Sequence, residues 1–364
     1  MKTLNIYVTR ELVIILVAAI GILTFAMVGG NLLQVFNFIS RGVPVSDAMK
    51  FAVYVAPMAL SYTIPWGILV SVLLLFGRMS ANNEITAMRA CGISIFQIIS
   101  PLIALTFVLT VICIYLQAYA SPIYLGKGRA LIKDVALTNP TALIVPGVPS
   151  EFGNMLVTVK SKTKDNHISG IQIYTFNKDK TFVKQDITAG NGLVKANTDK
   201  GTLSLILYNY NIISYKEKNT TGDRVYGKEL IVTLDTAKQI NSEPLSQKLS
   251  YMTFTELMGS ISLYRKHGLD PTVAEVQLGF NVAMGLSPIS FLLLGLPLAI
   301  RTSRKETSIG LFVSVILAGL YFSLMIACQA MSGSPNLYPK TLLWIPNIAY
   351  QLGGLFFLLR ISGR

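Results

Sequence analysis

Six stretches of the chain lack Asp, Glu, Lys and Arg and are long enough to cross a membrane as a helix. A membrane-spanning helix needs roughly 20 predominantly apolar residues. The uncharged stretches are Leu12–Ser40, Phe51–Gly77, Ala90–Gly126, Val276–Ile300, Thr307–Pro339 and Thr341–Leu359. We therefore predict a bundle of six transmembrane helices, three on each side of a long polar segment.

The polar segment between the third and fourth stretches has a different pattern, in which apolar and polar residues alternate. Leu203, Leu205 and Leu207 fall on one face of an extended chain, and Ser204 falls on the other. Alternation with turn signals every eight to twelve residues is typical of an antiparallel sandwich or jelly roll. The alternating runs are Met155–Lys160, Ile168–Phe176, Thr181–Ala189, Gly192–Ala196, Thr202–Tyr208 and Arg224–Leu234.

These patterns predict a membrane α-helical bundle with an inserted antiparallel β-jelly-roll domain. Thr253 and Glu256 have the spacing of a capping box, which predicts the start of an amphipathic helix after the β-domain. The predicted order is transmembrane helices 1–3 in residues 1–126, with a short cytoplasmic helix near 80–92, then the β-domain in 127–250. An amphipathic connecting helix in 251–275 and transmembrane helices 4–6 in 276–364 complete it.

Basic residues are unevenly distributed between the two ends of the predicted spans, and the formal net charge is +13. Loops on the side of both termini hold Lys2, Arg10, Arg78, Arg89, Arg301, Arg304, Lys305, Arg360 and Arg364, whereas the short loops opposite hold Arg41, Lys50 and Lys340. The positive-inside rule therefore predicts cytoplasmic termini and a β-domain on the opposite side of the membrane, which is the periplasm if the cell is Gram-negative. Basic residues at helix ends favour lipid over nucleic acid as the partner.

The chain lacks the motifs of an enzyme. It has no GxxxxGK[ST] phosphate-binding loop, so ATP hydrolysis is expected on a separate subunit. His167 and His267 lie far apart in sequence, and the three cysteines form no CxxC motif, so no metal or cofactor is expected. The polar residues inside the spans are amides, which indicate hydrogen bonds between helices rather than substrate contacts.

The loop Arg78–Ser94 predicts a short amphipathic helix on the cytoplasmic side. Ser80 would cap a helix that begins at Ala81, and Glu84 would lie in its first turn, where the helix dipole favours a carboxylate. Ile85 and Met88 share one face. Such a helix would dock either into the cleft of an ATPase or onto lipid, and the residues alone leave both open.

Three stretches resemble the LptF/LptG family of lipopolysaccharide-export permeases. They are Glu84-Ile-Thr-Ala-Met-Arg-Ala-Cys-Gly-Ile-Ser94, Asn139-Pro-Thr-Ala-Leu-Ile-Val-Pro-Gly147 and Gly295-Leu-Pro-Leu-Ala-Ile-Arg-Thr-Ser-Arg-Lys-Glu-Thr-Ser-Ile-Gly310. The Ala-Cys-Gly run resembles LptF more than LptG. The chain departs from the family in having Asn31/Gln34 and Gln277/Asn281 where members commonly carry basic residues.

The resemblance implies a permease subunit of an ABC transporter that extracts lipopolysaccharide from the inner membrane and passes it to a periplasmic bridge. The implied partners are an LptB-type ATPase dimer, a second LptF/LptG-type permease, and LptC-type and LptA-type jelly-roll proteins. The ATPase would contact Glu84, Ile85, Met88 and Arg89, and lipid phosphates would contact Arg41 and Lys50. The lipid path in the β-domain would include Val157, Ile171, Ile173, Leu203, Leu205 and Leu207.

Three other functions are compatible with parts of the pattern. A secondary transporter usually shows charged spans in matched halves, and charges are missing here. A lipoprotein-release-type or macrolide-type ABC permease typically has four spans, with its periplasmic domain after the first. A non-transport membrane scaffold for periplasmic partners is a further alternative. Copurification of an ATPase would distinguish a transporter from such a scaffold.

Overall fold

The computed structural model describes most of the chain in two compact units. One unit holds Met1–Leu32, Ala52–Lys127 and Leu245–Arg364, and the other holds Leu33–Phe51 and Gly128–Pro244. The described residues are 2–40, 44–138, 146–147, 149–163, 166–177, 182–197, 202–216, 219–235, 245–301, 307–334 and 337–362.

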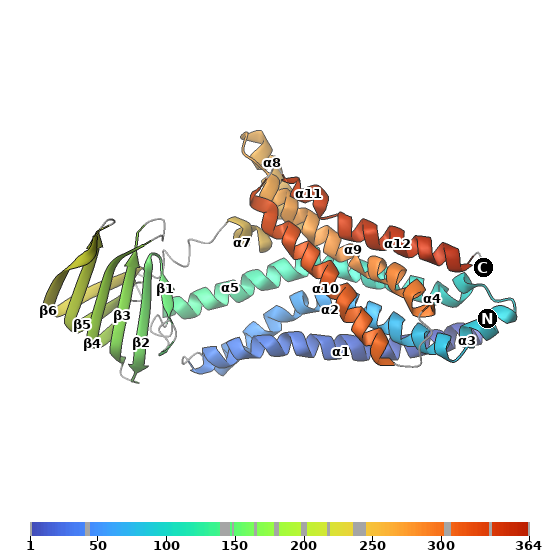
Figure 1. Cartoon of the computed structure of the whole chain (residues 1–364), viewed down its shortest axis with the longest axis horizontal. Coiled ribbons are helices and arrows are strands. Elements are labelled where there is room, and N and C mark those ends of the chain that lie inside the picture. Colours follow the sequence, from blue (N-terminus) through green and yellow to red (C-terminus); the bar gives the residue numbers. More distant parts are fainter. Residues whose placement is uncertain are drawn as a thin grey trace. The chain divides into compact units, whose positions relative to one another are not determined.

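Long apolar helices form the first unit (Figure 1). Within the described residues, six segments are long and apolar enough to cross a membrane: Leu4–Gly30, Val45–Ala81, Ile95–Leu131, Thr272–Arg301, Ile309–Gly333 and Pro339–Ile361. They correspond to α1 (Lys2–Ser40), α2 (Val45–Ala81), α4 (Ile95–Tyr115) with the helices that continue it, α9 (Thr272–Arg301), α10 (Thr307–Ala330), and α11 (Pro339–Leu342) with α12 (Ile345–Ser362). The prediction of six spans is confirmed.

The third span continues without a break beyond its predicted end at Gly126. A single π-helical turn, η1 (Leu116–Ala120), joins α4 to α5 (Ser121–Thr138). The predicted domain boundary at residue 127 lies inside α5, where the chain also divides into its two compact units, between Lys127 and Gly128, and the first strand begins at Ser150. Sequence pattern could not locate this end because α5 is much less apolar than α4 yet stays helical.

Buried amides join three of the membrane helices. Asn347 of α12 is 2% exposed, and its Oδ1 accepts hydrogen bonds from Ser290 Oγ of α9 at 2.6 Å and from the Tyr321 hydroxyl of α10 at 3.0 Å. Its Nδ2 donates to the carbonyl of Ala283 at 2.9 Å. A polar group in an apolar bundle must be satisfied internally. The expected role of the span amides in joining helices is therefore confirmed for Asn347.

A glycine allows α12 to approach α9 at backbone distance. A Cβ atom at Gly354 would lie 2.3 Å from the carbonyl carbon of Leu293, whereas one at the neighbouring Gly353 would meet nothing within 4 Å. Small residues at helix interfaces permit such close packing in membranes. Gly354 thus fixes the spacing of these two helices.

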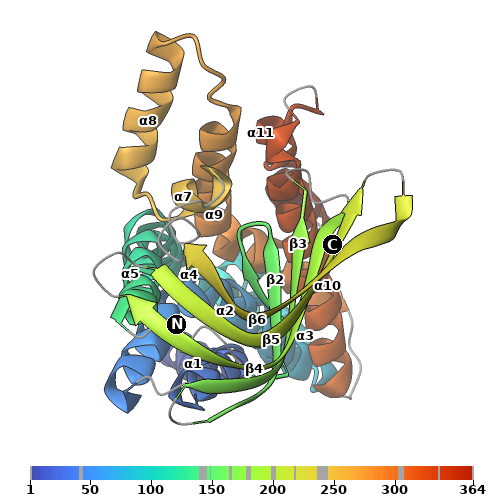
Figure 2. The same cartoon turned by 90° about the vertical axis from the view of Figure 1, so that its left-hand side faces the viewer.

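In the part of the β-domain that the structure describes, six antiparallel strands pair in chain order, and Figure 2 shows their strong curvature. The strands are β1 (Ser150–Phe152), β2 (Met155–Lys162), β3 (His167–Phe176), β4 (Val183–Asn197), β5 (Thr202–Lys216) and β6 (Asn219–Asp235). The prediction of an inserted antiparallel β-domain is confirmed. The described strands form a single meander, whereas a jelly roll has two sheets with crossed connections.

Two predicted runs in this domain prove to be one strand. Val183–Ala189, from the predicted run Thr181–Ala189, and the whole of Gly192–Ala196 belong to β4, which pairs with β5 on both sides of Gly190. Gly190 and Asn191 read as turn residues in the sequence, but the ladder continues across them. Pairing with a long neighbouring strand therefore overrides the local turn preference.

Two short helices lead from the β-domain back to the membrane: α7 (Leu245–Ser250) and α8 (Phe254–Lys266). The predicted capping box of α8 is confirmed, because the Thr253 amide donates to Glu256 Oε2 at 2.7 Å and the Glu256 amide donates to Thr253 Oγ1 at 3.5 Å. The hydrogen bond from the Thr253 amide, followed by that from its hydroxyl, holds the pKa of Glu256 below its usual range.

Candidate functional site

The short helix predicted after the second span begins three residues later than expected. It is α3 (Glu84–Ala90), and its N-cap residue Asn83 has a left-handed backbone with no side-chain cap. Ser80 does not cap it, because the Ser80 hydroxyl donates to the carbonyl of Ile300 at the end of α9, at 2.8 Å. The predicted start at Ala81 is therefore wrong. The Ser80 hydroxyl bonds to a carbonyl 220 positions away in the sequence and is not used as a local helix cap.

Glu84 ties this helix to the first span. Its carboxylate accepts a hydrogen bond from the Tyr7 hydroxyl of α1 at 3.4 Å and one from Asn82 Nδ2 at 3.2 Å. Nearby, Arg78 at the end of α2 forms an ion pair with Glu11 of α1. Sequence reasoning missed Tyr7, because no local signal connects residues 77 positions apart. These contacts join α1, α2 and α3 at one end of the bundle.

The four residues predicted to contact an ATPase face different surroundings. Ile85 is 5% exposed and belongs to the core of the helical bundle, and Met88 packs against that core. Arg89 is exposed, and Glu84 is half-buried. The structure thus brings Ile85 into this chain's own core, so its side chain offers no surface to a partner in this conformation. The exposed residues of α3 are Thr86, Ala87, Arg89 and Ala90.

The structure describes one of the two residues predicted to contact lipid phosphates. Arg41 lies outside the described residues. Lys50 lies in the second turn of α2, where its ammonium group forms an ion pair with Asp47 Oδ1 at 2.8 Å. Its side chain is 57% exposed, so this pair is solvated and contributes little to stability. Asp47 and Lys50 are three residues apart, which places them on one face of a helix, so this ion pair could have been predicted from the sequence.

The residues predicted for a lipid path in the β-domain are brought together on one face of the sheet. Val157 pairs with Ile173, and Leu205 pairs with Val194 and with Val232 on its two sides. All six predicted residues are at most 2% exposed: Val157, Ile171, Ile173, Leu203, Leu205 and Leu207. They form one apolar cluster, in which Val159, Ile168 and Leu234 also take part. Because side chains of one face cover each other, the curved sheet buries this face.

Comparison with known proteins decides the family. The family described as lipopolysaccharide export system permease LptF/LptG matches residues 6–360 of the chain. The chain belongs to the LptF/LptG family. It is also 22% identical over 326 residues to the lipopolysaccharide export system permease protein LptG of Haemophilus influenzae, and the match covers 88% of each chain.

Membership in the LptF/LptG family supports the role of a lipopolysaccharide-export permease and of a multi-pass inner-membrane protein. It makes the chain a transporter permease. The predicted preference for LptF over LptG stays a prediction, because the family covers both subunits and the relative is an LptG.

Two of the stretches that resemble the LptF/LptG family lie at ends of membrane helices. Glu84–Ser94 forms α3 and the turn after it, and Gly295–Gly310 contains the end of α9 and the start of α10, with residues 302–306 outside the described part. Of Asn139–Gly147, only residues 146–147 are described. The hydrogen bond from Ser80 to Ile300 connects the region of α3 with the end of α9. The two described stretches thus belong to neighbouring parts of one end of the bundle.

Proposed function

We propose that this LptF/LptG permease works with a second permease subunit of the family and is driven by a separate LptB-type ATPase dimer. In this proposal it extracts lipopolysaccharide from the inner membrane and delivers it through its β-domain to LptC-type and LptA-type periplasmic proteins. The family match over residues 6–360 carries the proposal, because it includes the membrane spans, the inserted β-domain and α3 together.

The proposed orientation places both termini in the cytoplasm and the β-domain in the periplasm. Arg78, Arg89, Arg301 and Arg360 lie at or beside helix ends on the proposed cytoplasmic side. Single cysteines at Thr86 and at Lys228, both exposed, would test this in a background without native cysteines. An impermeant thiol reagent should label Lys228→Cys in cells with a permeabilised outer membrane and leave Thr86→Cys unlabelled. Labelling of Thr86→Cys would reverse the orientation.

The proposed ATPase contact is the exposed face of α3. Ile85 and the hydrogen bond between Glu84 and Tyr7 hold this short helix against the bundle, while Arg89 stays exposed. A helix fixed on one face and exposed on the other can transmit a movement of a bound subunit to α1 and α2. Glu84 has two parts in this proposal, as an internal acceptor for Tyr7 and as a charge near the ATPase.

Three substitutions distinguish the internal role of Glu84, as acceptor for Tyr7, from its role as a charge near the ATPase. Glu84→Lys should release the ATPase on purification, because loss of one partner of a desolvated charge pair costs about 2–5 kcal/mol. Arg89→Glu should weaken the ATPase contact without touching the core. Tyr7→Phe removes only the internal hydrogen bond and should retain the ATPase. If Glu84→Lys and Arg89→Glu both copurify with normal amounts of ATPase, α3 is not the docking helix.

The proposed lipid path follows the apolar face of the β-domain. The six predicted residues form a continuous buried stripe, so acyl chains would enter by separating side chains that now contact each other. A photo-crosslinking residue at Leu205 should trap lipopolysaccharide when ATP is supplied. The same residue at Ser204, on the opposite face, should not. Crosslinks at Ser204 alone would place the path outside the buried face.

A further inference from the structure

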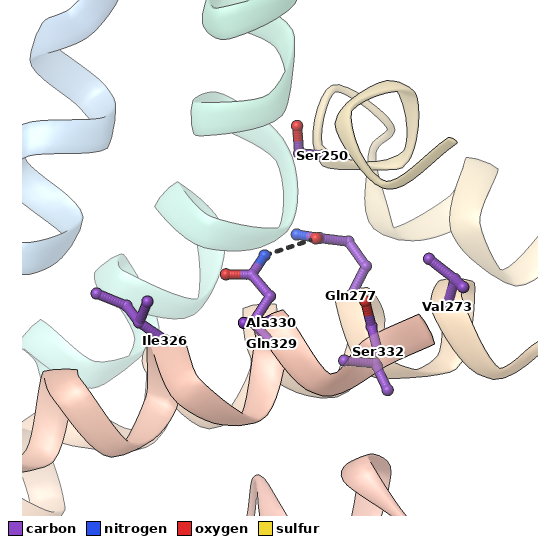
Figure 3. Close-up of a pocket in the computed structure, with 8 residues that line it drawn as sticks. Ser250, Val273, Gln277, Ile326, Gln329, Ala330 and Ser332 are labelled. Atoms are coloured by element: carbon purple, nitrogen blue, oxygen red, sulfur yellow. Dashed lines mark hydrogen bonds between the residues drawn. The ribbon is translucent and has the colours of Figure 1, made fainter. Parts of the chain in front are cut away.

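A cavity of about 370 Å³ opens between α7, α9 and α10 at the end of the bundle where α9 begins (Figure 3). Its polar lining comes from Ser250, Gln277, Gln329 and Ser332, and its apolar lining includes Ile326 and Ala330. A volume above about 300 Å³, with an apolar wall and a few polar groups, is typical of a small-molecule site. The residue types of the lining determine which chemical class of ligand the cavity would bind.

Two amides form the polar part of the cavity. Gln329 Nε2 donates to Gln277 Oε1 at 2.9 Å, and Gln277, which is only 7% exposed, donates from Nε2 to Asn281 Oδ1 at 3.0 Å. A side-chain amide offers two N–H donors and an oxygen with two lone pairs. These bonds leave the carbonyl oxygen of Gln329 available, and Figure 3 shows it pointing away from Gln277. The cavity therefore offers both donors and acceptors to a ligand.

No ionisable side chain is among the described residues that line the cavity. Glu275, two positions before Gln277, forms ion pairs with Arg265 and with Lys340, the latter at 3.0 Å. Both of those bases are thus engaged with a carboxylate. A phosphate placed in the cavity would lose water without gaining a counter-charge, which is unfavourable. Hydroxyl groups suit neutral amides because each can donate to and accept from them.

The apolar wall of the cavity continues along the outside of α10. Ile326 lines the cavity and is 56% exposed. Phe312 and Ile316 lie on the same side of the helix, at helical spacing, and are also exposed. A ligand with a polar head in the cavity would therefore find a hydrocarbon-facing surface for its chain.

We propose that this cavity binds the uncharged, hydroxyl-rich headgroup of an amphiphile, a saccharide, whose hydrocarbon chain lies along α10. The proposal rests on the cavity and its lining, and it holds whether or not the proposed transport partners are correct. Two lipids carry this chemistry: the saccharide part of lipopolysaccharide and a neutral glycolipid of the bilayer.

The test uses the full-length chain in nanodiscs and an alkyl maltoside with a photoreactive diazirine in its chain. Mass spectrometry should find the label on α10 near Ile326. Dodecyl maltoside should compete for labelling at a concentration about tenfold lower than dodecylphosphocholine, which has the same chain and a charged head. Equal competition by the two detergents would overturn the proposal, because the site would then recognise only the chain.

Substitutions assign the effect to the amides. Gln329→Met keeps the side-chain shape and should weaken maltoside competition about fivefold, the value of one net hydrogen bond. Gln351→Met is the matched control, because Gln351 is another half-buried amide that donates one bond, to Ser290 Oγ at 3.1 Å, away from the cavity. An equal loss in both variants would contradict a specific site.

A second variant covers the case in which Gln329→Met fails to fold, as judged by its thermal unfolding. Ala330→Trp fills the cavity from the exposed side of α10 and should abolish labelling near Ile326. Undiminished labelling would overturn the proposal. Competition by lipopolysaccharide would support it with the transported lipid as the ligand, and competition by glucosyl diacylglycerol alone would support it with a bilayer glycolipid. Competition by neither saccharide lipid would overturn it.

Discussion

The β-domain and the helical bundle both bury a large apolar cluster, but they select neighbouring elements by different means. In the β-domain, backbone hydrogen bonds run between strands and set the register, so that Leu205 pairs with Val194 and Val232. In the bundle, backbone hydrogen bonds are satisfied within each helix. Its helices must therefore recognise each other through side chains such as Asn347 and through the close approach at Gly354.

This difference teaches where each region is vulnerable. In the sheet, loss of apolar volume should be the most damaging change, because the backbone ladder already supplies the polar contacts. In the bundle, disturbing the close packing of helices or removing a single amide should lower stability. Lipid is as apolar as the helix surfaces, so the hydrophobic effect does not drive the helices together. Substitutions can test each side of this comparison.

The largest effect is expected from Leu205→Ala in the β-domain. Leu205 is fully buried, so its truncation leaves a cavity and should cost about 2–5 kcal/mol of the free energy of unfolding. Pulse proteolysis of the β-domain in the full-length protein would measure it. Ser204→Ala, on the opposite face, should change stability by less than about 0.5 kcal/mol. Similar losses at both positions would mean that the sheet does not have one buried face.

The next effect concerns helix spacing. Gly354→Ala places a methyl group against the Leu293 backbone and should cost about 1–3 kcal/mol, because the helices must move apart. Gly353→Ala meets open space and should be neutral or stabilise the helix by up to about 1 kcal/mol. Thermal unfolding in detergent compares the two. A lower Tm for Gly353→Ala than for Gly354→Ala would refute the close approach.

A smaller effect is expected when the amide network is cut. Asn347→Ala removes the shared partner of Ser290 and Tyr321 and should cost about 1–2 kcal/mol, the range for polar contacts between membrane helices. Ser314→Ala is the control, because its buried hydroxyl donates only to the Leu311 carbonyl of its own helix. If both variants lose the same stability, hydrogen bonds between helices have no special part in the bundle.

The smallest effect concerns the start of α8, where the capping box of Thr253 and Glu256 adds side-chain hydrogen bonds to the packing of Leu257. Because the pKa of Glu256 is lowered in the folded protein, its stabilisation is present above the unfolded pKa and is lost as pH falls through the folded one. The protection factors of the first amides of α8, which correct for the slower intrinsic exchange in acid, should therefore fall as the pH drops below the usual range of a glutamate. Glu256→Gln retains the capping box without a charge and should remove this pH dependence.

The sequence predicted features that depend on local pattern. The six spans, the alternating strands and the Thr253–Glu256 capping box follow from composition, period or a spacing of three residues. It failed where distant residues compete with local ones. Ser80 was predicted to cap a helix, but its hydroxyl bonds to Ile300, and α3 begins at Glu84.

The candidate site was predictable in part for the same reason. Leu203, Leu205 and Leu207 could be placed on one face because a strand alternates by two. The burial of Ile85 in the bundle could not be foreseen, since its amphipathic pattern is the same whether it packs on a partner or on its own chain. The contact between Tyr7 and Glu84 depends on tertiary folding alone.

The π-helical turn Leu116–Ala120 has a consequence for how the third span is compared among relatives. A π-turn accommodates one residue more than an α-helical turn, and such turns occur mostly as single bulges inside α-helices. Deleting one residue there would restore a regular α-helix and leave the faces of α5 where they are, whereas a deletion within α4 would rotate everything after it by about 100° around the axis. Aligned relatives should therefore differ in length by one residue at this turn, while the sequence pattern on each side of it keeps its own phase.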